Sequence, residues 1–255
     1  MNEKFKIIIT ILISLLVCIE LIIILNTKNL QKNNPIEISK SKEYPEYKVS
    51  SFITDEIINN SERIQMLGLY TQNISPENTK KDAEFIAIVQ IISCDYSSTE
   101  YDSVAGQTFG KMLINNVIKG NLKPGEVLDY AAIGGYLTIE EWESKQPEEA
   151  NQKREYLRKQ NGITIDKSKT YMHIQFDKCI DAEEGSTYLA YFNYNKEMGK
   201  YEFIGFHNGL MKLDLTKKQS VSVINNLDMN DVKVLNNNTR QYENLNDYIE
   251  KNINE

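Results

Sequence analysis

The clearest apolar pattern in the chain lies in residues 112–135. A first β-type run ends at a Lys-Gly pair (119–120), and a second begins after a Pro-Gly pair (124–125). Apolar residues occupy both parities of the first run, as expected of a strand with one face in a core and the other partly covered. Glycine can take positive φ and proline presets φ for a turn, so the pattern predicts two antiparallel strands joined by a defined loop.

Similar short apolar runs recur on both sides of this hairpin. Turn residues separate runs at 84–93, 108–119, 126–133, 170–176, 185–194, 200–207 and 209–215, the last strand that we predict. The runs at 185–194 and 200–207 form a second hairpin across residues 195–199. We therefore predict a mainly β domain over 82–216, a small OB-like barrel or a sandwich of about five to six strands.

A helical insertion interrupts the β pattern at residues 138–161. Its acidic residues come first and its basic residues last, which opposes the helix macrodipole and favours a helix. Pro147 either breaks this helix or begins a second one beside the first. We interpret the charge run as a solvated face, with Trp142 as the one ring that can hold it against the barrel.

The first 25 residues contain a near-continuous apolar run, Ile7 to Leu25. As a helix it is ~28 Å long, about the thickness of the hydrocarbon core of a bilayer, so we predict a single membrane-spanning anchor over 1–25. The alternatives are a cleaved secretory signal, for which the small residues of a cleavage site are missing, and lipid modification at Cys18. Lys4 and Lys6 precede the run and favour a cytoplasmic N-terminus, which places the main domain outside the cytoplasm at the cell membrane.

Polar segments flank the predicted β domain. Residues 26–81 are interpreted as a tether and a lead-in, with a short helix within 50–70. Residues 217–255 are interpreted as a polar C-terminal extension, in which 240–253 can form a short helix.

The composition excludes one class of partner. The 255 residues carry a formal net charge of −7, and a nucleic-acid-binding surface requires a basic face. Tyrosine outnumbers phenylalanine and tryptophan together (15 against 8 and 1), which suits a half-buried β architecture. We therefore expect no nucleic-acid partner.

Several short motifs carry a resemblance to a known family. They are Val-Ile-Lys-Gly at 117–120, Pro-Gly-Glu-Val at 124–127, and Cys179 six residues before Gly185, with Tyr-Leu following at 188–189. This arrangement, over residues 84–213, resembles the OB-type β-barrel of the netrin and metalloprotease-inhibitor (TIMP-like) modules. The resemblance implies the fold only, because the family is stapled by disulfides and inhibits through an N-terminal cysteine that has no counterpart here. The use of Asn, Lys and Ile also resembles that of cell-surface proteins of low-GC Gram-positive bacteria.

Reactive side chains are few. Cys94 and Cys179 either form a disulfide outside the cytoplasm or are two buried thiols. His173 with both cysteines would be an irregular zinc set without a C-x-x-C pair, so we expect no metal and no cofactor. His207 lies beside glycines in a predicted strand, and Asp177 beside either histidine would be an arbitrary dyad. The chain contains no nucleophile elbow, no zinc-protease helix motif and no phosphate-binding loop.

The aromatic residues of the second hairpin are the best binding candidates. Most of them belong to the core by their alternation, and Tyr191 and Tyr194 near the tip are the two that we expect to be exposed. The preferred hypothesis is a non-catalytic, membrane-anchored module that binds a protein or another envelope component. The alternative is a cell-envelope hydrolase or metal-dependent enzyme, which convergence of His173, His207, Asp177 and Cys179 in one pocket would favour.

Overall fold

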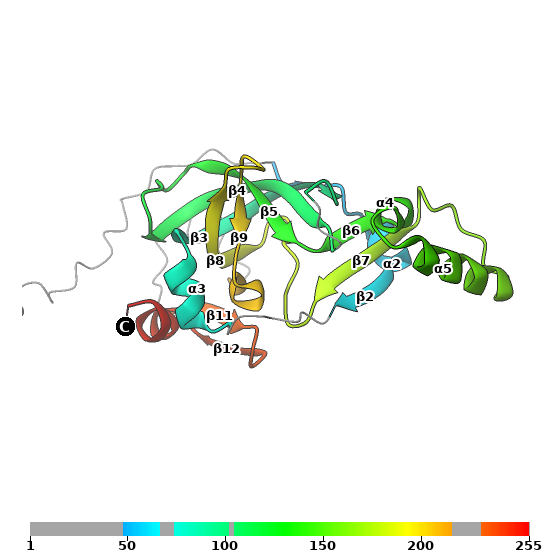
Figure 1. Ribbon diagram of the computed structural model, residues 1–255. Helices are drawn as coiled ribbons and strands as arrows, with labels where there is room; N and C mark the ends of the chain where they lie inside the picture. The colour runs from blue at the N-terminus through cyan, green and yellow to red at the C-terminus, as the bar shows by residue number, and fades with distance from the viewer. Residues whose placement is uncertain (1–47, 67–73, 102–104, 216–230, 255) are drawn as a thin grey trace, which may run out of the picture. The chain divides into compact units, whose positions relative to one another are not determined.

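Two long antiparallel strands, β3 (Phe85–Ser98) and β4 (Gln107–Lys119), form the centre of the structure. The computed structural model describes residues 48–66, 74–101, 105–215 and 231–254. The fold is mainly β, as the sequence predicts, with a nine-stranded sheet in the order β1-β3-β4-β5-β9-β8-β10-β11-β12 and a three-stranded sheet β2-β7-β6 (Figure 1).

Five strands of the large sheet close into a ring. The strand β5 (Val127–Ile133) pairs antiparallel with β4, and β9 (Lys200–Phe203) pairs in parallel with β5. The strand β8 (Thr187–Asn195) pairs antiparallel with β9 and also with β3. Because β3 has partners on both sides, the path β3-β4-β5-β9-β8 returns to its start. The two hairpins predicted from the sequence supply four of these strands.

The ring strand β3 is longer than its apolar pattern suggests. The predicted apolar run ends at residue 93, but Tyr96, Ser97 and Ser98 still pair with β4, opposite Phe109, Thr108 and Gln107. Ser97 and Thr108 also place their hydroxyl oxygens 3.0 Å apart across the pair. Backbone and side-chain hydrogen bonds thus extend the strand beyond the point where its hydrophobic signal ends.

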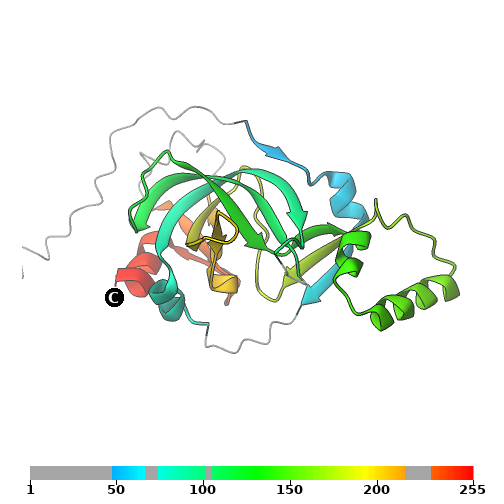
Figure 2. The ribbon, with the colours of Figure 1, turned by 45° about the horizontal axis from the view of Figure 1, so that its top comes forward.

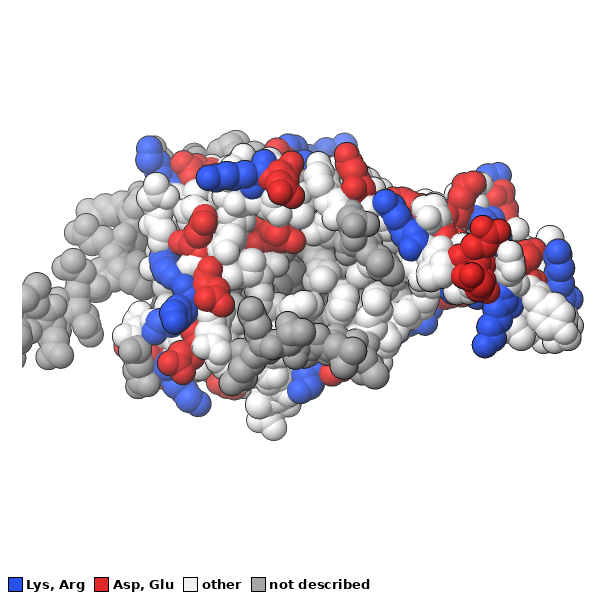
Figure 3. Space-filling model, viewed as in Figure 1, with Lys and Arg blue, Asp and Glu red and all other residues white. Residues whose placement is uncertain are grey.

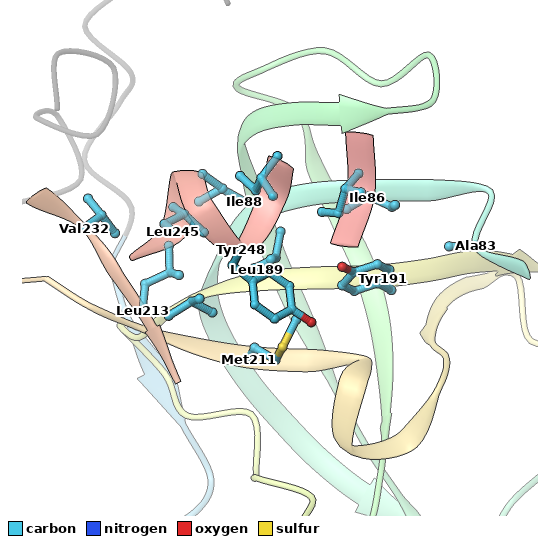
Figure 4. Close-up of a cluster of buried hydrophobic side chains, with 13 residues drawn as sticks. Ala83, Ile86, Ile88, Leu189, Tyr191, Met211, Leu213, Val232, Leu245 and Tyr248 are labelled. Atoms are coloured by element: carbon cyan, nitrogen blue, oxygen red, sulfur yellow. The ribbon is translucent and has the colours of Figure 1, made fainter. Parts of the chain in front are cut away.

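The two faces of β3 and β8 point into different cores. Ala87, Val89 and Ile91 of β3 belong to a cluster inside the ring, together with alternate residues of β8. Ile86 and Ile88 belong to a second cluster on the other face, and this cluster is completed by the C-terminal residues (Figure 4). Apolar residues at both parities of these strands therefore reflect burial on both faces.

The C-terminal residues form a layer over that second face. They comprise β10 (Leu210–Asp214), β11 (Lys233–Asn236), β12 (Gln241–Asn244), α6 (Leu245–Ile249) and the π-helical turn η4 (Glu250–Asn254). The helix α3 (Pro76–Asp82) lies beside this C-terminal helix in both views (Figures 1 and 2). The prediction of a short terminal helix is confirmed, whereas the two strands β11 and β12 after the expected last strand were not predicted.

The second sheet carries the helical insertion. It contains β2 (Glu62–Met66), β7 (Tyr171–Phe176) and β6 (Gly135–Thr138), with β2 parallel to β7 and β6 antiparallel to it. The insertion is two helices, α4 (Ile139–Ser144) and α5 (Glu148–Gln160), and Pro147 is the N-cap of the second. Trp142 packs with Ile139, Leu137, Met172 and Ile174 in a third core cluster, so it holds α4 against this sheet.

The lead-in is partly helical, as predicted. It contains α2 (Asp55–Asn60), whose N-cap Thr54 accepts a hydrogen bond from the backbone of Ile57. It also supplies β2 and the two-residue strand β1 (Ser50–Ser51), which pairs with β3. The predicted anchor, residues 7–25, lies outside the described residues. Among the residues that the structure does describe, no helix is long and apolar enough to cross a membrane.

Candidate functional site

The tip of the β8–β9 hairpin carries an aromatic pair, one member of which is exposed. Tyr194 lies opposite Tyr201 in the strand register, and their ring centroids are 5.2 Å apart. The Tyr194 side chain is 43 % exposed, whereas Tyr201 is half-buried and makes an edge contact with Phe85 at 5.6 Å. The turn is fixed by Asn195, whose side-chain oxygen accepts hydrogen bonds from the backbone of Glu197 and Met198. The exposure predicted for Tyr194 is confirmed.

Two carboxylates, those of Glu126 and Glu84, lie near this aromatic pair. Burial raises the pKa of Tyr201, and the nearby Glu126, Tyr194 and Glu84 raise it further. The backbone N–H of Tyr194 points to a carboxylate oxygen of Glu84 at 3.5 Å. The Tyr201 hydroxyl therefore stays protonated near neutral pH and is a hydrogen-bond donor. An aromatic face beside carboxylates can stack on a ligand and attracts positively charged groups.

Tyr191 was predicted to be exposed, and this prediction is wrong. The side chain is fully buried in the second core cluster, where it lies with Ile86 and Ala83 (Figure 4). It has the opposite parity to Tyr194 on β8, so it points away from the ring interior and under the C-terminal layer. Burial, followed by the neighbouring Tyr248, raises its pKa. Tyr191 is a core residue and contributes no binding surface.

Cys94 and Cys179 are free thiols, and both are buried. The Sγ of Cys94 lies 3.3 Å from the hydroxyl of Tyr130 and 3.3 Å from the carbonyl oxygen of Ala182. Burial raises the pKa of Cys94 to about 11 and, reinforced by Asp177 and Asp181, the pKa of Cys179 to about 12. Of the two alternatives, the structure shows buried thiols rather than a disulfide. Both thiols stay protonated near neutral pH and are poor nucleophiles.

His173 lies in the middle of β7 and is paired. Its Nε2 is 2.9 Å from Oδ2 of Asp181, and its ring stacks on Tyr136 at a centroid distance of 4.3 Å. Gln175 donates a hydrogen bond to the same carboxylate oxygen at 3.4 Å. The carboxylate partner is Asp181, which no pattern in the sequence indicated. Stacking and pairing fix this imidazole, which is only 8 % exposed.

His207 does not lie in a strand. It belongs to a short 3-10 turn, η1 (Phe206–Asn208), and is buried beneath residues of the C-terminal layer. Its backbone carbonyl accepts a hydrogen bond from the Asn237 side chain at 2.7 Å. Burial lowers the pKa of His207, Lys178 and Arg240 lower it further, and Asp177 opposes them. Lys178, Phe206 and Arg240 each have positive φ, so three left-handed non-glycine residues lie in or near this turn.

The four groups that could have formed a catalytic centre are linked through charged neighbours, since Asp177 acts on both Cys179 and His207, and Asp181 acts on Cys179. His173 is paired with Asp181, and the side chain of Asp177 accepts a hydrogen bond from Gln65 at 3.3 Å. His207 and Cys179 share electrostatic neighbours in Asp177 and Arg240. Within the described ranges, no group of three or more His, Cys, Asp or Glu residues is arranged to hold a metal ion.

One charged centre was not predicted from the sequence. Glu143 of α4 is buried and accepts hydrogen bonds from Arg158 at 2.9 Å and Arg154 at 3.4 Å. Lys167 lies 2.9 Å from its other carboxylate oxygen. Burial alone would raise the pKa of Glu143, but hydrogen bonds from Lys167 and Arg158 outweigh it and lower the pKa.

The Glu143 centre joins the two helices of the insertion. The guanidinium of Arg154 also lies over the Trp142 ring, 4.6 Å from its centroid. A hollow of about 630 Å³ opens beside the centre, and among the residues that line it are Gln146, Gln152, Tyr156, Lys159 and Lys167. The run of charges therefore has an inner, structural side as well as a solvated one.

Comparison of the chain with protein-family models, with curated proteins and with solved structures gives no match.

Proposed function

We propose that the chain is a non-catalytic binding module, anchored in the cell membrane by residues 7–25, whose main domain lies outside the cytoplasm. Its partner is a protein or another component of the cell envelope. The observation that carries the proposal is the aromatic pair Tyr194 and Tyr201 at the hairpin tip. Tyr194 leaves a large ring surface open to solvent that the core does not use, as is common for the aromatic anchors of binding sites.

We also propose that the ring of five strands is an OB-type barrel. In that barrel the first three strands are neighbours, the third lies parallel to the fifth, and the fourth returns to the first. The strands β3, β4, β5, β8 and β9, taken in chain order, follow this scheme, including the parallel pairing of β5 with β9. The β8–β9 hairpin then corresponds to the loop between the fourth and fifth strands, which is one of the ligand loops of such barrels.

The alternative, an envelope hydrolase or a metal-dependent enzyme, has weaker support. Acid–base chemistry near neutral pH requires a group that can reach its substrate and change protonation state. His173 is held by Asp181 and Tyr136, and the thiol of Cys179 is protonated and buried. A binding site formed by exposed aromatic residues requires neither group.

The test of binding compares two exposed tyrosines. The full chain, solubilised in a mild detergent, is used to capture partners from an envelope extract as wild type, Tyr194→Ser and Tyr242→Ser. Tyr242 is the matched control because its side chain on β12 is 49 % exposed and lies outside the hairpin. We expect Tyr194→Ser to lose at least ten-fold in capture, since an aromatic hot spot contributes ~2 kcal/mol or more, while Tyr242→Ser retains it.

Two results would contradict the proposal, and the second of them would favour the enzyme. A Tyr194→Ser variant that captures its partner normally would remove the hairpin from the site. A double variant His173→Gln, His207→Gln that folds normally but behaves like a deletion would assign the function to the histidines.

The anchor is tested separately: protease added to intact cells should degrade the domain, and N-terminal sequencing should begin before residue 25. A protected domain or a later start would contradict this topology.

A further inference from the structure

Helix α5 contributes no side chain to the apolar cores of the protein. It contains no buried residue, and none of its residues belongs to the three core clusters. Figures 1 and 2 both show it beside α4 and away from the two sheets. A 13-residue helix is marginally stable in water by itself. The position of α5 therefore depends on its polar contacts with α4 and with the loop that follows α5.

Glu143 of α4 is the point at which α5 is attached. Its buried carboxylate accepts hydrogen bonds from Arg154 and Arg158, and its backbone carbonyl accepts one from the Asn151 side chain at 2.8 Å. The guanidinium of Arg154 also lies over the Trp142 ring, which is 8 % exposed. Acidic and basic side chains gather over α4 and α5 (Figure 3). The attachment is thus a small cluster of charges around one buried carboxylate.

The loop after α5 remains with α4 when the helix moves. Lys167 lies 2.9 Å from the Glu143 carboxylate, and its backbone carbonyl accepts a hydrogen bond from the backbone N–H of Glu140 at 3.1 Å. Gly162, between α5 and this anchor, has a φ of 66° and open space where a Cβ would lie. If α5 detaches, Glu143 keeps Lys167 as its partner and the two arginines enter water. Detachment therefore leaves no buried charge unpaired, which is the main cost of breaking a buried ion pair.

The contacts of α5 also indicate which ligand the surface beneath it can take. Trp142 offers a ring face and Glu143 a carboxylate, and guanidinium groups of α5 occupy both. The Nε1–H of Trp142 is buried and has no hydrogen-bond partner in the part of the chain that the structure describes, an unfavourable state that water relieves once α5 opens.

We propose that α5 is an autoinhibitory latch. It detaches from α4 as a unit, while the two sheets stay folded, and so uncovers a site for an arginine side chain of a partner protein. An aromatic face next to a carboxylate suits the planar guanidinium, which stacks on the ring and donates to the carboxylate. This site is formed by other elements than the aromatic pair of the β8–β9 hairpin.

The first test follows the exposure of Trp142, the one tryptophan of the chain, in the full protein solubilised in a nonionic detergent. Quenching of its fluorescence by acrylamide measures access to the ring, and hydrogen exchange of α5 and of β3 measures the opening of each element. In Glu143→Gln the α5 amides should exchange about ten-fold faster, because charge-assisted hydrogen bonds are roughly twice as strong as neutral ones. Quenching should rise as well, and the exchange of β3 should stay unchanged.

Glu140→Gln is the matched control, because Glu140 lies on the same helix and is exposed. It should behave like wild type in both measurements. Faster exchange of β3 together with α5 would mean that α5 does not open as a separate unit. Faster exchange of α5 without a rise in quenching would mean that the helix frays without uncovering Trp142. Either result, or a Glu143→Gln variant that behaves like Glu140→Gln, would refute the latch.

The second test supplies the arginines from a separate molecule. The double variant Arg154→Gln, Arg158→Gln changes only residues outside the core clusters, and its Trp142 should be quenched more readily than in wild type. A synthetic peptide with the wild-type sequence of residues 147–162, at millimolar concentration, should lower this quenching. The same peptide with both arginines replaced by Gln should not. Protection by neither peptide, or equal protection by both, would refute the arginine site.

Discussion

The tyrosines of β8 show where the alternation of side chains along a strand predicts burial and where it does not. Tyr188, Phe192 and Tyr194 share one parity of β8, and the cross-strand pairs Phe192–Phe203 and Tyr194–Tyr201 follow from it. Tyr191 has the other parity, and its exposure depends on whether that face is covered. The sequence contained a signal for this cover, because Leu189 and Tyr191 are both apolar on a face that a solvated strand would make polar.

The histidines show the limits of local patterns more clearly. His173 was correctly placed in a strand, but its partner Asp181 lies in the loop that follows, and no periodicity links the two. His207 follows Gly205, whose positive φ of 80° begins a turn where an apolar run predicted a strand. Side-chain pairing across a loop depends on tertiary structure, so the sequence alone could not identify it.

His207 should make the stability of the protein depend on pH. Its pKa is lowered in the folded state, chiefly by burial and further by Lys178 and Arg240, so below the ordinary value of 6.5 the unfolded chain binds more protons. Stability is therefore complete above about pH 6.5 and is lost as the pH falls toward the lowered pKa. The thermal midpoint of wild type should fall more between pH 7.5 and 5.5 than that of His207→Gln.

The comparison of wild type with His207→Gln isolates the contribution of the His207 imidazole. The two proteins differ only at residue 207, so every other group contributes equally to both. Tyr242→Ser should show the wild-type fall. If the thermal midpoints of His207→Gln and wild type fall by the same amount over this pH interval, then His207 is not held in its neutral form by the fold.

At the scale of elements, prediction was best where a turn and an apolar run occurred together. The positive φ values of Gly120 and Gly125 match the turn expected between β4 and β5, and both strands lie within one residue of their predicted limits. The short strands β1 and β2 were missed, because each pairs with a distant partner and has only a few residues. Such strands form through long-range pairing, which local propensity does not determine.

Two isoleucines of β4 allow the contribution of each face of the strand to the free energy of unfolding to be measured. Ile114 is fully buried in the cluster inside the ring, whereas Ile118 is only partly buried against the second cluster. Replacing Ile114 by Ala should lower the free energy of unfolding by ~2 to 5 kcal/mol, because the cavity it leaves cannot be filled. Ile118→Ala should cost less, since solvent already reaches its site.

Denaturant unfolding of the two variants measures both costs, and each serves as the control for the other because the chemical change is identical. Equal losses would mean that the two faces of β4 are covered alike. A larger loss at Ile118 than at Ile114 would contradict the assignment of Ile114 to the ring interior.

At the scale of the whole molecule, the main difference from expectation lies in the C-terminal residues. The polar composition of 217–255 suggested an extension, yet Val232, Val234, Leu245, Tyr248 and Ile249 are all buried in the second core cluster. The signal was present in the spacing of Leu245, Tyr248 and Ile249, which places three apolar groups on one side of a helix. Asparagine and aspartate between these positions obscured it, because they lower the mean hydropathy without occupying the buried face.

This arrangement predicts that the C-terminal residues are needed for folding. A chain that ends after Leu215 lacks β11, β12 and α6, and so exposes Ile86, Ile88, Leu189 and Tyr191 to water. Because several large apolar side chains are uncovered together, the free energy of unfolding should fall by more than the ~2 to 5 kcal/mol of a single core truncation. That amount is already a large part of the stability of an ordinary domain.

Thermal unfolding of the shortened chain should therefore show no cooperative transition near the midpoint of the full chain. The variant Val234→Ala, which removes part of one buried side chain, should keep a cooperative transition at a lower midpoint. A shortened chain that unfolds at the midpoint of the full chain would mean that β3 and β8 do not require the C-terminal layer.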